Sequence, residues 1–315
     1  MLWGACVFFL ALLIGCTPET TDNNLGNSDL EGRILLWHSW SEEDALILDE
    51  VIDVFEQLHP AVTVITVRVD ARELQTRYGD TAVLGLGPDL LIGPSDWLLP
   101  LANETLIDNI EPELTADESF DVARYVPSAF ALVSYAEGIY GLPLNLQTPA
   151  LYYNRRLLGE SEPADTFEGL LAQASEGQRV ALSTRSEIAF MGVQAFGSPF
   201  LAEVDNELRV GATQDGFISW LQWLQMAQEA PGIILSTDEE RLTTLFLQEQ
   251  VTYYIASYDQ LEMFQNALNA DGEQIVGATP LPSGPLGQAR PLIGADILMF
   301  NTASSDSQRV VAIEL

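Results

Sequence analysis

Two short segments of the chain combine an aromatic ring with hydroxyl and carboxylate side chains. These side chains are Trp40, Ser41 and Glu42 in the first segment and Ser95, Asp96 and Trp97 in the second. A flat aromatic face can pack against the apolar face of a ligand ring, while hydroxyl and carboxylate oxygens accept hydrogen bonds from ligand hydroxyls. Such residue types predict non-covalent binding of a small polar molecule.

Each of these residues also has a purely structural interpretation. Trp40 and Trp97 could pack beneath their loops, because large aromatic side chains are often buried. Ser41 begins a Ser-Glu-Glu-Asp sequence that is typical of a helix N-terminus, so Ser41 and Glu42 could serve only to cap that helix. The residue types alone leave both interpretations open.

The composition excludes several kinds of catalysis. The 315 residues include 46 acidic and 13 basic residues, giving a formal net charge of -33, and every basic residue is an arginine. Without lysine the chain cannot form a P-loop or a Schiff base, and its negative charge argues against a nucleic-acid partner. The only histidines, His38 and His59, are separated by a predicted helix, so we expect no metal site and no cofactor.

The first residues have the properties of an export signal. Residues 1–15 are uncharged and largely apolar, and they are too few to span a membrane, which takes about 20 apolar residues. The Leu-Ile-Gly-Cys sequence that ends at Cys16 resembles a bacterial lipoprotein signal, whose cysteine is acylated; an ordinary signal peptide is the alternative. Residues 16–32 are polar and lack periodicity, so we expect a flexible lipidated tether that holds an extracytoplasmic protein at the bacterial cell membrane.

The rest of the chain alternates short apolar runs with helical patterns. Strands are predicted at residues 34–37, 62–69, 88–92, 180–183, 251–255, 275–279 and 297–300. This alternation predicts an α/β fold with mostly parallel sheets and a ligand at the carboxyl ends of the strands. A further helix is predicted from the stripe Phe217, Leu221 and Leu224, and we assign the neighbouring Trp220 and Trp223 to the core.

Six segments occur in the order found in a known family. They are residues 34–60, which begin ILLWHSW and end in His-Pro; 88–101; 140–158, with the sequence YGLPLNLQTPALYYNRRLL; 165–168; 246–263; and 277–300. In this order they resemble the family 1 extracellular solute-binding proteins of ABC importers, the maltose-binding-protein-like group. The resemblance covers most of residues 33–312.

The resemblance implies a type II periplasmic-binding-protein-like fold of two α/β lobes with a ligand cleft between them. Carried over by position, lobe 1 comprises residues 33–146 and 294–315, and lobe 2 comprises residues 147–293. The family normally continues for several more helices, so we expect the C-terminus to be truncated within an apolar-faced helix at residues 310–315. Members of the family bind their ligand by hinge closure, without catalysis, and the membrane permease recognises the closed form.

The resemblance also points to ligand-binding residues. Asp96 matches a position that accepts hydrogen bonds from hydroxyls, and Gln147 falls at the crossing between lobes, where it could instead bond the hinge backbone. Arg185 could clamp a carboxylate or hydroxyl, or form a surface salt bridge. Two positions depart from the family pattern: Tyr258 lies in a Ser-Tyr-Asp sequence where the family has Gly-Ser-Trp, and Asp296 stands where a tryptophan often sits.

From the residues and the resemblance together, we expect a monomeric, lipid-anchored receptor of an ABC importer. It would bind a sugar or oligosaccharide and contact the permease subunits in the membrane. A polyamine or other cationic solute is the first alternative, because carboxylates replace aromatic groups in the expected cleft. A secreted glycoside hydrolase is the second, although abundant carboxylates do not by themselves identify a catalytic pair. A sensor module with the same fold is the third, and the sequence does not separate sensing from transport.

Overall fold

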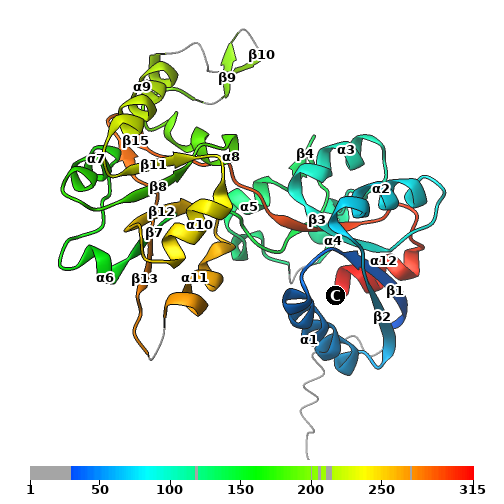
Figure 1. The fold of residues 1–315 in the computed structure, drawn as a ribbon. Helices are drawn as coiled ribbons and strands as arrows, with labels where there is room; N and C mark the ends of the chain where they lie inside the picture. Colours follow the sequence, from blue (N-terminus) through cyan, green and yellow to red (C-terminus); the bar gives the residue numbers. More distant parts are fainter. Residues whose placement is uncertain (1–29, 118–119, 200, 205–206, 211–214, 270–271) are drawn as a thin grey trace, which may run out of the picture.

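The computed structural model describes residues 30–315 except 118–119, 200, 205–206, 211–214 and 270–271. The predicted signal peptide, Cys16 and nearly all of the predicted tether lie outside the described residues. Two five-stranded sheets form the centres of two lobes, one on each side of Figure 1. In the part of the chain that the structure describes, no helix is both long and apolar enough to cross a membrane.

The sheet of lobe 1 contains the N-terminal strands. Its strand order is β2 (Ala61–Arg68), β1 (Glu31–His38), β3 (Leu90–Pro94), β16 (Asp296–Phe300) and β6 (Leu142–Pro143). Strand β1 runs parallel to β2 and β3, whereas β16 runs antiparallel to β3 and β6. The sheet is therefore mixed.

Helices cover both faces of this sheet. Apolar side chains of β1 point alternately to the two faces, so each face needs a covering layer. Ile34 and Leu36 belong to a core cluster with α1 (Glu42–Leu58) and α12 (Asp306–Glu314). Trp37 belongs to a second cluster with α2 (Ala71–Ala82) and α3 (Leu98–Asn103). The short elements of this lobe are η1 (Ser95–Trp97), α4 (Glu111–Ala116), η2 (Val122–Arg124), α5 (Pro127–Ala131), β4 (Ser134–Tyr135) and β5 (Gly138–Ile139).

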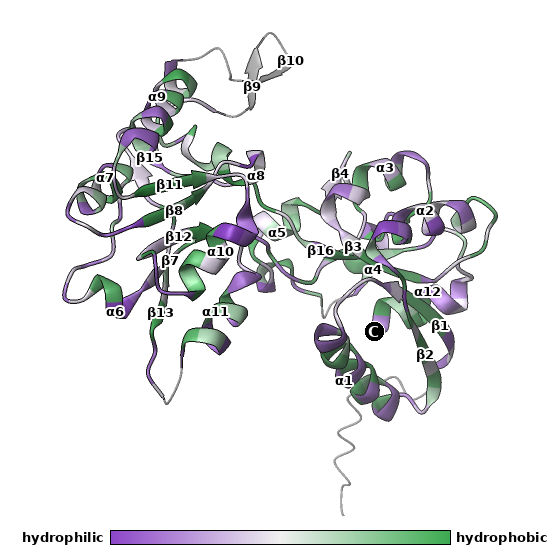
Figure 2. Cartoon of the chain, in the orientation of Figure 1, coloured by the Kyte–Doolittle hydropathy of each residue, from purple (hydrophilic) through white to green (hydrophobic). Residues whose placement is uncertain are grey.

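Lobe 2 repeats this architecture. Its strand order is β11 (Ile233–Ser236), β8 (Val180–Ser183), β12 (Tyr253–Ala256), β7 (Ala150–Asn154) and β13 (Val276–Thr279). Helices α7 (Phe167–Ser175) and α9 (Asp215–Glu229) share one core cluster, and α10 (Glu239–Leu247) and α11 (Gln260–Leu268) share another. In Figure 2 the central strands are largely apolar, whereas α10 is strongly hydrophilic at one end, in keeping with its initial Glu-Glu-Arg sequence. The short elements are α6 (Arg155–Leu158), α8 (Ser186–Ala189), η3 (Phe190–Gly192), β9 (Leu201–Val204), β10 (Glu207–Val210), β14 (Ser283–Gly284) and β15 (Gly287–Gln288).

The predicted mostly parallel arrangement is confirmed: in each sheet four of the five strands run in one direction, and only β16 in lobe 1 and β7 in lobe 2 run against them. The predicted apolar stripe of α9 is corrected in part, because Phe217 and Leu224 pack against the core only partly buried. The buried face of α9 carries Trp220 and Trp223, whereas Leu221 is 50% exposed. The two indole rings stack with their centroids 5.0 Å apart, and both are buried in the core of lobe 2. Their assignment to the core is confirmed.

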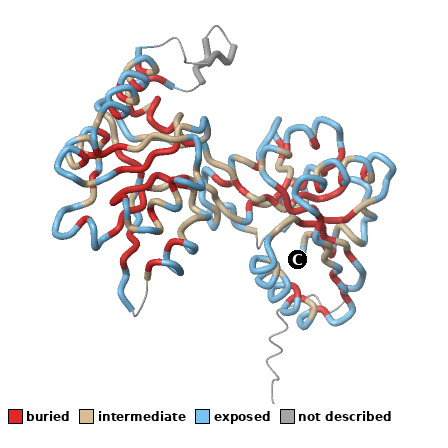
Figure 3. The backbone as a smooth tube through the Cα atoms, in the orientation of Figure 1, coloured by how far each residue is buried: buried red, intermediate tan, exposed pale blue. Residues whose placement is uncertain are grey.

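The chain passes between the sheets twice, through two crossing segments. The first, residues 144–149, joins β6 to β7, and the second, residues 289–295, joins β15 to β16. The backbones of Gln147 and Gly294 pair across these segments, with N···O distances of 2.7 and 3.0 Å. Most residues of both segments are only partly buried (Figure 3).

Candidate ligand-binding site

The loop after β1 places Trp40 at the rim of lobe 1. Helix α1 begins immediately after Ser41, whose Oγ accepts a hydrogen bond from the Asp44 backbone N–H at 3.0 Å, so the predicted cap is confirmed. Trp40 stands just before this cap and packs, partly buried, against the core cluster under α1. The cap and the strand end thus fix the backbone on both sides of the ring.

Asp296, the first residue of β16, holds the Trp40 ring from the opposite end of the chain. Asp296 Oδ2 accepts a hydrogen bond from Trp40 Nε1 at 3.1 Å and another from Asn145 Nδ2 at 2.8 Å. The Asp296 backbone N–H donates to Asn145 Oδ1 at 2.8 Å. The sequence predicted Trp40 and Asp296 as separate contacts, and it missed Asn145, whose only signal was its place two residues before Gln147.

Tyr258, in the loop between β12 and α11, is a residue of lobe 2 that interacts with this group. Burial raises the pKa of its hydroxyl above the ordinary 10.0, and the negative charges of Asp296, Asp259 and Asp44 act in the same direction. A hydrogen-bonding interaction with the side chain of Gln147 opposes the shift. Tyr258 therefore faces carboxylates of lobe 1 and the first crossing segment together.

A cavity of about 390 Å³ adjoins the two crossing segments. It is lined by Gln147, Thr148, Pro149, Leu292, Ile293 and Gly294 from these segments and by Arg185, Ile188, Glu239 and Ser257 from lobe 2. Arg185 Nε lies 3.9 Å from Glu239 Oε1, which also accepts a hydrogen bond from Ser183 Oγ at 3.0 Å. The cavity thus combines an arginine, a carboxylate, the side-chain amide of Gln147 and two hydroxyl groups, which are polar groups that can orient a hydroxylated ligand.

A second cavity of about 370 Å³ continues along the edge of lobe 2. It shares Ile188, Glu239 and Ser257 with the first cavity and adds Glu240 and Asp259. The two cavities adjoin at the residues they share and are together called the groove; its charged residues are one arginine and three carboxylates.

The segment after β3 makes different contacts. Trp97 packs against the core of lobe 1, its ring lying directly over the backbone of Gly93. Ser95 bonds to the backbone of Ala295, donating from its N–H at 2.8 Å and accepting on Oγ at 3.2 Å. Asp96 is exposed. The structure thus attaches Ser95 next to Asp296 and holds Trp97 against the sheet.

Glu42 and His59 make contacts of their own, whereas the ring of His38 meets the edge of the Trp40 ring, with centroids 6.4 Å apart. The side chain of Glu42 is 94% exposed and forms an ion pair with Arg68 at 3.4 Å. His59 is the residue that ends α1, and its backbone N–H donates to the Phe55 carbonyl; His38 is buried at the end of β1, where burial lowers its pKa. Among the described residues, no group of three or more His, Cys, Asp or Glu side chains could hold a metal ion.

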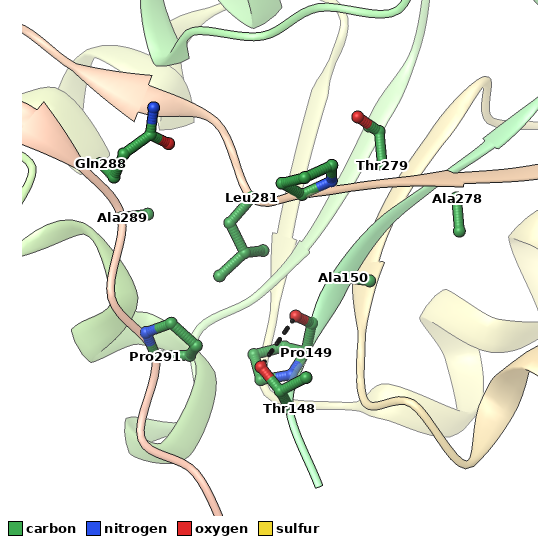
Figure 4. A pocket seen from close by; sticks show the side chains of 10 residues that line it. Thr148, Pro149, Ala150, Ala278, Thr279, Leu281, Gln288, Ala289 and Pro291 are labelled. Carbon is green, nitrogen blue, oxygen red and sulfur yellow. Dashed lines mark hydrogen bonds between the residues drawn. The ribbon is translucent and has the colours of Figure 1, made fainter. Parts of the chain in front are cut away.

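The cavity in Figure 4 has a different character. It measures about 440 Å³ and shares Thr148 and Pro149 with the cavity at Arg185. Figure 4 shows the side chain of Leu281 pointing into it between Pro149 and Pro291. None of its lining residues is charged, so it offers little to orient a polar ligand.

Comparisons with known proteins agree with this architecture. Residues 50–313 match the model of a family described as bacterial extracellular solute-binding protein. The maltotriose-binding protein of Pyrococcus abyssi is 26% identical over 139 residues, which are 44% of this chain and 29% of that protein. The galactooligosaccharide-binding protein of Bacillus subtilis is 20% identical over 276 residues, which are 83% of this chain and 63% of that protein. The chain therefore spans less than two thirds of the length of either relative.

Two solved structures share the fold. The GacH receptor of Streptomyces glaucescens, determined without ligand and with acarbose, gives a TM-score of 0.74 at 18% identity and covers 90% of this chain and 75% of its own. A cyclo/maltodextrin-binding protein in complex with maltotetraose gives a TM-score of 0.73 at 18% identity, with coverages of 89% and 73%.

Proposed function

We propose that this chain, which belongs to the bacterial extracellular solute-binding protein family, is the carbohydrate-binding receptor of an ABC importer. The family match confirms the resemblance seen in the sequence, and the solved structures confirm the two-lobe type II fold. The carbohydrate ligand, the role in an ABC importer and the lipid anchor are what we propose beyond the family and the fold.

The observation that carries the proposal is the group around Asp296. It joins Trp40 from lobe 1, Tyr258 from lobe 2 and Gln147 from the first crossing segment. Aromatic rings beside hydrogen-bond acceptors suit a sugar, which has apolar ring faces and hydroxyl edges. The proteins that share this fold or sequence bind maltotriose, galactooligosaccharides, acarbose or maltotetraose, which supports the same ligand class here.

The proposed action is closure of the lobes around the ligand. Lobe 1 would comprise residues 33–146 and 294–315 and lobe 2 residues 147–293, hinged at the Gln147–Gly294 pair. The candidate ligand contacts remain Trp40, Ser41, Glu42, Ser95, Asp96, Trp97, Gln147, Arg185, Tyr258 and Asp296. The protein would bind without catalysis, as a monomer outside the cytoplasm, anchored through acylated Cys16 and recognised by permease subunits.

A cationic solute is the second candidate, favoured by the carboxylates near Tyr258 and along the groove. Asp44, Asp259 and Asp296 all act on the pKa of Tyr258, and Glu239 and Glu240 line the groove. Carboxylates at this density suit an ammonium group as well as a hydroxyl.

A thermal-shift screen separates these candidates. The chain from residue 16 onward, with Cys16→Ser, is heated with maltotriose, maltotetraose, galactooligosaccharides or spermidine. A ligand present at 100 times its dissociation constant adds about 2.7 kcal/mol of stability, which raises the melting midpoint by several degrees. A sugar response supports the proposal, and a response to spermidine alone favours the cationic solute.

Calorimetry on site variants then tests the location. Trp40→Ala should weaken sugar binding at least about tenfold, since it removes an aromatic contact surface. Tyr135→Phe, which alters an exposed tyrosine of lobe 1, is the matched control and should bind normally. Equal affinity of Trp40→Ala and wild type contradicts the site, and release of shortened sugars by the pure protein contradicts binding without catalysis.

A further inference from the structure

We infer that Asn145 and Asp296 form a positioning relay that sets the orientation of the Trp40 indole ring. This inference rests on the proposed function, because the ring it positions is the proposed ligand platform of lobe 1. Asn145 would act only through Asp296, and Asp296 would both hold the ring and offer an oxygen to the ligand.

The two residues of the relay are joined by reciprocal hydrogen bonds. Asn145 Nδ2 donates to Asp296 Oδ2, and Asn145 Oδ1 accepts from the Asp296 backbone N–H, each at 2.8 Å. The backbone N–H of Leu144 donates to the Asp296 carbonyl, also at 2.8 Å. An asparagine amide offers a donor and an acceptor in one plane, and neither aspartate nor alanine at position 145 could make both side-chain bonds.

The relay ends at the only polar atom of the Trp40 side chain. An indole ring has a single N–H donor, and Trp40 Nε1 donates it to Asp296 Oδ2 at 3.1 Å. The ring is partly buried against the core cluster under α1, so packing limits its position while the hydrogen bond selects its rotation. Loss of the acceptor would leave the ring free to turn, with its N–H unpaired in a partly buried place.

The two carboxylate oxygens of Asp296 have different roles: one holds the Trp40 ring, and the other is available to the ligand. Oδ2 accepts from both Trp40 and Asn145. Within the described part of the chain no hydrogen bond ends on Oδ1, and the charge of this carboxylate acts on the hydroxyl of Tyr258 in lobe 2. Oδ1 is therefore the oxygen that a ligand hydroxyl would meet, close to the ring that Oδ2 holds.

The relay can be tested without any ligand by fluorine NMR of the chain labelled with 5-fluorotryptophan. The Trp40 resonance is assigned as the signal that disappears in Trp40→Phe. In Asn145→Ala and Asp296→Ala this resonance should shift and broaden. In Asp296→Asn it should stay close to wild type, because the amide oxygen can accept both bonds that Oδ2 accepts. Asn103→Ala, which removes another amide of lobe 1, is the matched control and should leave the signal in place.

Binding of maltotriose gives the second measurement. Asn145→Ala should bind about tenfold more weakly than wild type, and Asp296→Asn should also bind more weakly although its Trp40 signal is retained, because Oδ1 becomes a donor nitrogen. An unchanged Trp40 resonance in both alanine variants overturns the relay. If Asp296→Ala does not fold, Asn145→Ala and Asp296→Asn still test the relay in the same way. If wild type binds no sugar, the proposed ligand is wrong, and the Trp40 resonance still decides on the relay.

Discussion

Gly93→Ala should destabilise lobe 1, because the ring of Trp97 occupies the space that a side chain would need. A methyl group on Gly93 would lie 2.5 Å from Trp97 Cε3 and 2.7 Å from Cζ3, and 3.3 Å from Met299 Cε. Carbon atoms prefer separations of about 3.5–4.0 Å, so the ring must retreat by about 1 Å. Met299 is fully buried on the neighbouring strand and blocks movement toward the sheet. Overpacking of this kind costs about 1–3 kcal/mol.

Urea unfolding followed by circular dichroism measures this loss, with Gly79→Ala as the matched control. Gly79 lies inside α2, and a methyl group there would meet no atom within 4 Å. Alanine is the better helix former, so Gly79→Ala should raise the free energy of unfolding by about 0.5–1 kcal/mol. If Gly93→Ala stays within about 0.5 kcal/mol of wild type, Trp97 does not depend on this contact. The ring would then be free to face a ligand instead of packing against the sheet.

Two further predictions concern polar groups of lobe 1 that are shielded from solvent. Tyr78→Phe should cost about 1 kcal/mol, because the buried hydroxyl donates to the Leu106 carbonyl at 2.8 Å; Tyr135→Phe, at an exposed site, should cost less than half of that in the same urea titration, and equal losses would refute the role of burial. Burial raises the pKa of Asp108 above the ordinary 3.8 although its partner Arg309 lowers it. The folded state then holds this proton more tightly than the unfolded state, so stability should fall as the pH rises from about 3.8 through the raised pKa. Wild type should lose stability relative to Asp108→Asn over that range, and a constant difference between the two unfolding curves would contradict the prediction.

The sequence predicts the local helices and strands well. It does not predict the direction of a strand when that direction depends on distant segments of the chain. The strand predicted at residues 180–183 coincides with β8, because four consecutive apolar or small residues are buried on both faces. The antiparallel direction of β16 could not be derived from its own residues. It follows from the path of the chain, which leaves lobe 1 through residues 144–149 and returns through residues 289–295. Likewise, the stripe predicted for α9 was displaced around the helix: Phe217 and Leu224 lie at the edge of the core, whereas the face that carries Trp220 and Trp223 is fully buried.

In the candidate site, too, the local sequence identifies the residue types but not the distant residues that they contact. The residue types at Trp40 and Trp97 pointed equally to a ligand or to packing. Their environments differ because of residues that spacing does not reveal: Gly93 lets the Trp97 ring lie on β3, whereas Asp296, 256 positions away, accepts the indole N–H of Trp40. The signal for the first was a glycine four residues earlier, and for the second no local signal exists.

Asp296 shows why a departure from a family pattern can carry more information than agreement with it. The resemblance places a tryptophan at this position in many members, so an aspartate there first suggests a cleft with one stacking surface fewer. In the structure the carboxylate accepts hydrogen bonds from the indole of Trp40 and from Asn145, which lies in the first crossing segment. An aromatic ring at position 296 could accept neither bond. An aspartate at position 296 therefore removes one stacking ring and orients the ring of Trp40. Beside that ring it presents Oδ1, which accepts no hydrogen bond within the described residues.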